Sequence, residues 1–295
     1  MSPNAASSGV TARDTNTRRP APAPRRPTAW EHVRGALQDG RIRTPLIYGL
    51  SLLAVLGGWQ FAAHRFRLLL LFPPPSATFE RFVALLLDGS IEKASAVSLL
   101  RILAGFLVGS LAGILLGLLL GSSRLARALL EPYVHFFRFV PPLAWFAPVL
   151  LWFGIGEKAR ILLIVYTTVF AVALNAMAGV AAVSRNKIRM ARAFGARPFQ
   201  VFVLITLPAS VPYIFTGMRV AMGNSFMTVV AAEMLAAGEG LGYLVNTGVI
   251  FLDTTTVFSG VIALGILGFT TDRVFRWLIR RFGGRFTAGP FAFDQ

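Results

Sequence analysis

The sequence predicts an all-α membrane protein with about six transmembrane helices. Its 295 residues are 55% hydrophobic and only 14% charged, whereas soluble domains carry roughly a quarter charged residues. The uncharged stretches are also long, and each comes close to the ~20 residues that a helix needs to cross a hydrocarbon core. These stretches are residues 44–63, 102–123, 139–156, 161–184, 198–218 and 254–271.

The distribution of Lys and Arg predicts that both termini are cytoplasmic. Eight Arg precede the first stretch, five basic residues lie within 185–197, and a further Arg cluster follows the last stretch. With six spans these segments share one side, which the positive-inside bias makes cytoplasmic. The loop from Glu233 to Asp253, on the opposite side, has three acids and no base.

The remaining composition excludes several function classes. The net charge of +16 follows topology and forms no basic face interleaved with aromatics, so nucleic-acid binding is not expected. There is no Cys, and the three His are scattered, so neither disulfides nor a metal site is expected. Residues 1–45, rich in Pro, Ala and Arg, are predicted to be a disordered cytoplasmic tail. We expect the transmembrane domain over 46–282 and a second tail over 283–295.

A glycine stripe marks the second predicted span. Five glycines follow one another at four-residue spacing along one helix face, and smooth faces of this kind let helix backbones approach closely in lipid. Two readings remain open, a static packing seam and a sliding contact between moving helices. The stripe consists of Gly105, Gly109, Gly113, Gly117 and Gly121.

Polar residues within the spans are candidates for the substrate pathway. Asn224 and Thr228 share one face of the fifth span, and neutral donors suit an oxyanion that must be released again. Hydrogen bonds that only tie helices together are the alternative. Glu233 is read either as an outer gate or binding-protein contact, or as part of a structural ion pair. The candidates are Asn175, Asn224, Ser225, Thr228 and Glu233.

The third span is expected to begin near Arg138 and to bend at Pro148. Arg138 and Arg219 are expected near the inner ends of their spans. There each Arg is read as an interfacial anchor in preference to a ligand.

The segment 188–208 predicts a cytoplasmic helix–turn–helix element. A first helix is expected to end at Gly195, a residue suited to a left-handed C-terminal cap, and Pro198 to start a second helix. Phe199, Phe202 and Val203 would share one face, and Pro208 would end the helix where the chain re-enters the membrane. Exposed apolar residues in such a loop call for a partner groove, whereas a merely solvated basic loop is the alternative.

At these residues the sequence resembles the permease subunits of bacterial ABC importers. Their motif is Glu-Ala-Ala, three residues, Gly, nine residues, Ile, one residue, Leu-Pro, and Arg189 and Met190 replace its first two positions here. Stretches such as Pro141-Pro142, Ala231-Ala232-Glu233 and Gly240-Leu-Gly242 are similar to the nitrate, sulfonate, taurine and bicarbonate branch. The matching coupling residues are Ala191, Gly195, Phe199, Phe202, Ile205, Leu207 and Pro208.

The resemblance implies a type I ABC importer permease fold in the bacterial inner membrane. It further implies a homodimer that forms the pathway for a small anionic solute, two ATPase subunits that hold ATP and Mg, and a periplasmic or lipid-anchored binding protein. Consistent with this division, the sequence has no Gly-x-x-x-x-Gly-Lys loop for ATP. No enzymatic activity is expected of this chain. The alternative is an ion-coupled secondary transporter or channel that acts without an ATPase.

Overall fold

The computed structural model describes residues 40–65 and 71–283, with side chains from Ile47 to Arg281. The predicted tail over 1–45 lies almost entirely outside the described residues, as does the tail over 283–295 except for Gly283. The chain divides into two compact units, residues 1–57 and 58–295. Helix α2 (Gly40–Arg65) contains the first predicted span and runs across this division.

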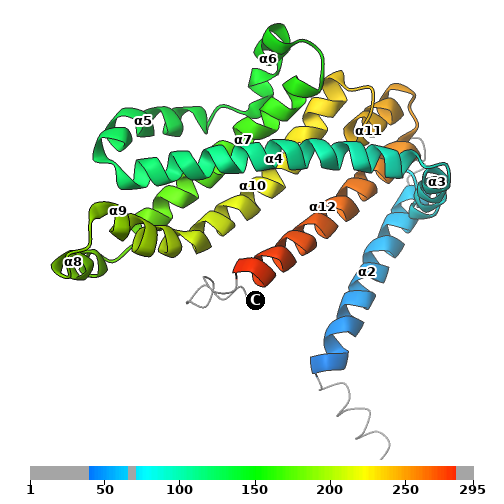
Figure 1. The fold of residues 1–295 in the computed structure, drawn as a ribbon. Helices are drawn as coiled ribbons and strands as arrows, with labels where there is room; N and C mark the ends of the chain where they lie inside the picture. The colour runs from blue at the N-terminus through cyan, green and yellow to red at the C-terminus, as the bar shows by residue number, and fades with distance from the viewer. Residues whose placement is uncertain (1–39, 66–70, 284–295) are drawn as a thin grey trace, which may run out of the picture. The chain divides into compact units, whose positions relative to one another are not determined.

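Within residues 58–295, the described chain is helical throughout (Figure 1). Among the residues that the structure describes, four helices are long and apolar enough to cross a membrane, and they contain predicted spans two, four, five and six. They are α4 (Ser90–Ser122), α7 (Glu157–Ala181), the continuous helix Pro198–Ala236 and α12 (Thr254–Gly283). The shorter α3 (Pro75–Leu87) and α11 (Leu241–Ile250) pack against α12.

The third predicted span is broken, so the expectation of one helix over 139–156 is wrong. Helix α5 (Arg124–Phe137) ends before it, and a 3-10 turn (η1, Pro142–Trp145) leads into α6 (Phe146–Phe153). Helix α5 and the segment Pro142–Phe153 meet at 92°, and they count as a fifth span if they are taken together. Pro141 and Pro142 lack an N–H and disfavour helical backbone in the residue before them, so the helix cannot continue through this segment.

Pro148 does not bend the middle of a span as expected. It lies in the first turn of α6, where the missing N–H has no helical partner to lose.

The glycine stripe of α4 lies against α7. A Cβ added to Gly105, Gly109, Gly113, Gly117 or Gly121 would come within 2.5–2.8 Å of a Cβ on α7. The facing residues repeat at the same four-residue spacing: Ile164, Thr168, Val172, Ala176 and Val180. The two backbones are therefore too close for any larger side chain in the stripe.

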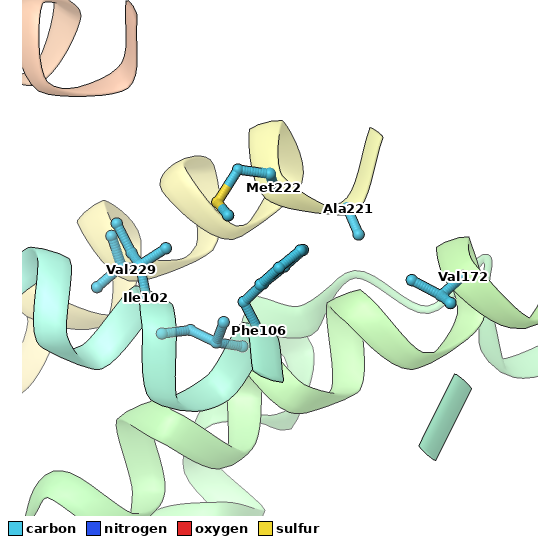
Figure 2. Close-up of a cluster of buried hydrophobic side chains, with 7 residues drawn as sticks. Ile102, Phe106, Val172, Ala221, Met222 and Val229 are labelled. Carbon is cyan, nitrogen blue, oxygen red and sulfur yellow. The ribbon is translucent and has the colours of Figure 1, made fainter. Parts of the chain in front are cut away.

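One apolar cluster joins α4, α7 and α10 (Leu207–Ala236) (Figure 2). Phe106 of α4 is almost fully buried in it, and Val172 of α7 and Val229 of α10 are completely buried. The cluster consists of Ile102, Phe106, Ile164, Val172, Ala221, Met222 and Val229. These three helices form the scaffold that positions the polar residues described below.

Asp253 caps the start of α12. Its carboxylate accepts hydrogen bonds from the Thr255 hydroxyl at 2.5 Å and the Thr256 hydroxyl at 2.6 Å, and it pairs with Arg81 at 3.4 Å. Burial alone would raise the pKa of Asp253, but these hydrogen bonds and the Arg81 charge outweigh it and lower the pKa below its ordinary value. The cap connects α3 to the start of the last span.

Candidate functional site

The helix–turn–helix element forms as the sequence predicts. Helix α8 (Arg185–Ala193) is followed by a turn at Gly195, whose φ is +82°. The Gly195 N–H donates to the Arg192 carbonyl at 2.9 Å, and the Ala196 N–H to the Ala191 carbonyl at 3.0 Å. This pair of bonds is a Schellman motif. Because only glycine adopts such a φ without strain, Gly195 sets the direction in which the chain leaves α8.

The second arm begins at Pro198, also as predicted, with α9 (Pro198–Val201). The Gln200 side chain accepts from the Arg197 backbone N–H at 2.8 Å and closes the start of this helix. Figure 1 shows α8 and α9 together at one end of α7 and α10.

Pro208 does not end the second helix, contrary to expectation. The helix runs without interruption from Pro198 to Ala236, and residues Phe202–Thr206 form a π-helical turn (η2) immediately before Pro208. Pro208 has no N–H for the carbonyl four residues earlier, and a wider turn absorbs this loss without a break. The helix–turn–helix element is therefore continuous with the helix that contains the fifth predicted span.

The turn presents apolar side chains that nothing in the described chain covers. Met190 is 61% exposed, Phe194 87% and Phe199 75%. Phe202 is half-buried and Val201 is buried against the bundle. The remaining motif residues, Ala191, Ile205, Leu207 and Pro208, are half-buried and form the base of the element.

An open cavity of about 400 Å³ lies where the break between α5 and η1 meets α7 and α10. Asn224 and Thr228, two predicted pathway residues, both line it. The Thr228 hydroxyl donates to the Asn224 carbonyl at 3.0 Å and lies 3.2 Å from the Thr167 hydroxyl. The residues that line this cavity are Arg138, Phe139, Val140, Pro142, Tyr166, Thr167, Phe170, Ala171, Leu174, Asn224, Met227 and Thr228.

Asn175 lines a second, smaller cavity of about 230 Å³ with Pro212, Tyr213 and Thr216. It lies one helical turn beyond Ala171 of the first cavity, and its amide donates to the Ala171 carbonyl at 2.8 Å. The two cavities therefore follow one another along α7 and α10.

Ser225 is fully buried and lies outside both cavities. Its hydroxyl donates to the Ala221 carbonyl at 2.8 Å and lies 3.2 Å from the Thr168 hydroxyl of α7. This geometry is that of a hydrogen bond between helices, the alternative left open for the polar residues.

Glu233 is also fully buried, in an ion pair away from both cavities. The Arg101 guanidinium donates to its carboxylate at 2.7 Å, and Arg101 is itself 5% exposed. The Ser98 hydroxyl at 2.8 Å and the Gly242 N–H at 2.9 Å complete the set of donors. Of the two readings of Glu233, the structure has the geometry of the ion pair.

Sequence reasoning missed the partners of Glu233. Arg101 also forms two hydrogen bonds of 2.6 Å to the Glu157 carboxylate and one of 2.7 Å to the Glu239 carbonyl. Arg160 donates to Glu157 at 2.6 Å and to the Ala236 carbonyl. Arg101 directly precedes an uncharged stretch in the sequence, which was the one sign of its position. Helix α4 begins earlier, at Ser90, so Arg101 lies inside the helix.

Two further arginines were expected near the inner ends of their spans. Arg219 pairs with Asp272 of α12 at 3.1 Å, and Asp272 also pairs with Arg276 at 2.8 Å. Arg138 differs from this expectation, because it lies at the break in the third span and lines the first cavity. No group of three or more His, Asp or Glu side chains among residues 40–65 and 71–283 could hold a metal ion.

Comparison with known proteins gives concordant matches. Residues 109–284 match the family described as binding-protein-dependent transport system inner membrane component. A probable ABC transporter permease protein of Brucella melitensis is 38% identical over 79% of this chain and 95% of the relative. The taurine transport system permease protein of Escherichia coli is 37% identical over 76% of this chain and 83% of the relative. An inward-facing structure of the MetNI methionine ABC transporter covers 61% of this chain and 91% of its own, with 21% identity and a TM-score of 0.48.

Proposed function

Because this chain belongs to the family of binding-protein-dependent transport system inner membrane components, we propose that two copies of it form the pathway of an importer for a small sulfonate-bearing solute or a similar oxyanion. The family places this chain in the membrane as the permease, and ATP is hydrolysed on a separate subunit. Permeases of this family work with a solute-binding protein and as dimers. To this we add two copies of this chain per transporter, the class of solute, and the residues that line the pathway.

The observation that carries the proposal is the succession of two cavities along α7 and α10. The first holds the hydroxyls of Thr167 and Thr228 and the amide of Asn224, and the second holds the amide of Asn175. Amide and hydroxyl groups of this kind can donate hydrogen bonds to an oxyanion. The taurine permease of E. coli provides independent support for this solute class.

The ATPase subunits, with Mg and ATP bound between them, would dock on α8 and α9. The exposed side chains of Met190, Phe194 and Phe199 supply an apolar surface suited to a groove. The uninterrupted helix from Pro198 to Ala236 would transmit a movement of this element to Asn224. The family's Glu is replaced by Arg189, so this permease would rely on the apolar contact and on the geometry at Gly195.

The orientation proposed from the charge pattern agrees with these roles. With both termini cytoplasmic, α8 and α9 face the cytoplasm, and the ends of α7 and α10 that carry Glu157 and Glu233 face outward. The binding protein would then deliver solute at that outer end.

Native mass spectrometry of the partner binding protein, purified without added ligand, tests the solute class. We expect a retained molecule that carries a sulfonate or another oxyanion group. Retention of a neutral sugar or of a metal ion would overturn the assignment of the solute while leaving the family unaffected.

A further inference from the structure

The break in the third span exposes irregular backbone at membrane depth. The Tyr166 hydroxyl lies 2.6 Å from the Phe137 carbonyl and 3.2 Å from the Val140 carbonyl, on either side of Arg138. Tyr166 is the tenth residue of α7, which puts it about 14 Å from the Glu157 end and about 22 Å from the Ala181 end at ~1.5 Å per residue. Arg138 therefore lies well inside the bundle's length.

Such breaks occur within a bilayer only where protein buries them or where they line a water-filled cavity. Here the cavity of about 400 Å³ is beside the break, and Arg138, Val140 and Pro142 form part of its wall. In secondary transporters, interrupted helices form the substrate site. A charged residue at this depth is itself a functional candidate.

Arg138 differs from the arginines of the bundle that are held by a carboxylate. Arg81, Arg101, Arg160 and Arg219 each pair with a carboxylate. Among the residues that the structure describes, no carboxylate lies within salt-bridge distance of Arg138. Its guanidinium instead lies 4.5 Å from the centroid of the Phe139 ring.

The rest of the cavity wall suits a small oxyanion. Asn224, Thr167 and Thr228 supply an amide and two hydroxyls, and Phe170 and Met227 supply apolar surface. No acidic residue is among the described residues that line the cavity. A volume of about 400 Å³ is in the range of small-ligand sites.

The geometry points to a binding site in which the Arg138 guanidinium holds the oxyanion group of the solute while Asn224 and Thr228 supply neutral hydrogen bonds. A guanidinium presents a planar fork of donors that matches a sulfonate or carboxylate. The contact of Arg138 with the Phe139 ring is a weak cation–π attraction. This inference rests on the proposed function for the identity of the solute. The anion site itself depends only on the positive charge of Arg138 in the cavity.

The chain has no native Cys, so a single cysteine at Asn224 can report the electrostatic potential inside the cavity. In the full transporter, Asn224→Cys is treated with 2-sulfonatoethyl methanethiosulfonate and, separately, with the trimethylammonium analogue. We expect the anionic reagent to react faster relative to the cationic one when Arg138 is present. With Arg138→Gln added, the ratio should fall about tenfold, since one nearby charge acts through a partly desolvated medium.

Ile155→Cys provides the matched control. Ile155 is 79% exposed in the turn between α6 and α7 and lies outside the cavity. Its reagent ratio should not change with Arg138→Gln. If the ratio at Asn224→Cys is likewise unchanged, the proposed site is wrong.

Solute uptake by the reconstituted transporter gives a second readout. Arg138→Gln should reduce taurine uptake at least tenfold, and Arg138→Lys should restore part of it. Arg124→Gln, an exposed arginine at the other end of α5, should leave uptake unchanged. Retention of the partner ATPase on size exclusion shows that each variant is assembled.

The two experiments separate the site from the proposed function. If the wild-type transporter imports no oxyanion but the reagent ratio still depends on Arg138, the anion site stands and the proposed function fails. If taurine is imported equally by wild type and Arg138→Gln, and the ratio is unchanged, the site fails and the proposed function stands.

Discussion

Replacing Phe199 is expected to weaken the docking of the ATPase. The side chain is 75% exposed in the described chain, and burying a Phe side chain completely stabilises a complex by about 1.5–3 kcal/mol. Three quarters of that gain, about 1–2 kcal/mol, remains available to a partner groove. Since 1.4 kcal/mol is about a tenfold change in Kd, Phe199→Ala should raise the Kd for the ATPase by about 5- to 30-fold.

Phe199→Asp should have a larger effect, because it also places a carboxylate in an apolar groove. We expect a loss of more than about 100-fold, which adds at least ~1 kcal/mol to the lost burial. The assay is biolayer interferometry between the detergent-solubilised permease and its purified ATPase partner.

Phe251→Asp is the matched control for this series. Phe251 is 76% exposed, almost the same as Phe199, and it follows α11 at the end of the bundle that we assign to the outer side. Its substitution should leave the Kd for the ATPase unchanged. The reasoning would be refuted if both Phe199 variants bound the ATPase with wild-type affinity, or if Phe251→Asp weakened binding equally.

Three further predictions concern stability, each measured as the melting temperature of the purified permease in detergent. Gly117→Ala should destabilise by about 1–3 kcal/mol because the new Cβ meets α7, whereas Gly265→Ala, with nothing within 4 Å, should stabilise by up to about 1 kcal/mol; equal effects would contradict the close seam. Glu233→Gln should destabilise by about 3 kcal/mol because it breaks a buried pair, and Glu239→Gln, exposed beside Lys93, should change nothing measurable. The melting temperature lost in Asp253→Asn should be greatest above about pH 5 and disappear as pH falls through the lowered folded pKa, since a depressed pKa stabilises the fold only while the carboxylate is charged; a difference that persisted at low pH would contradict the cap.

Much of the helix–turn–helix element at 188–208 and of the glycine stripe on α4 could be predicted because both follow from local backbone rules. Gly195 and Pro198 mark a helix end and a helix start by conformational preference alone. The glycines of α4 lie on one face because of helical periodicity, and their position against α7 follows once a close approach is assumed.

The sequence was less informative where the outcome depends on competing roles of proline. The third span was expected to begin near Arg138, but Pro141 and Pro142 prevent a helix from continuing through this segment. Pro208 was read as a helix end, whereas a π-helical turn at Phe202–Thr206 keeps the helix intact. Both errors concern how neighbouring turns adjust, which the residue types do not specify.

The ion-pair network and the cavity could not be predicted because they join distant segments. Arg101 meets Glu157 and Glu233 across 56 and 132 positions. Arg138 was placed at an inner end because the third span was expected to be one helix that begins near Arg138. Once the break is present, the same residue lies beside Asn224 in the cavity wall.

Uptake of labelled taurine by proteoliposomes tests the central claim most directly. The vesicles contain the permease, its ATPase partner and the external binding protein, and uptake is compared with and without internal ATP, and with and without each partner. We predict accumulation only when ATP and both partners are present. Accumulation driven by an ion gradient through the permease alone would contradict the account and favour a secondary transporter.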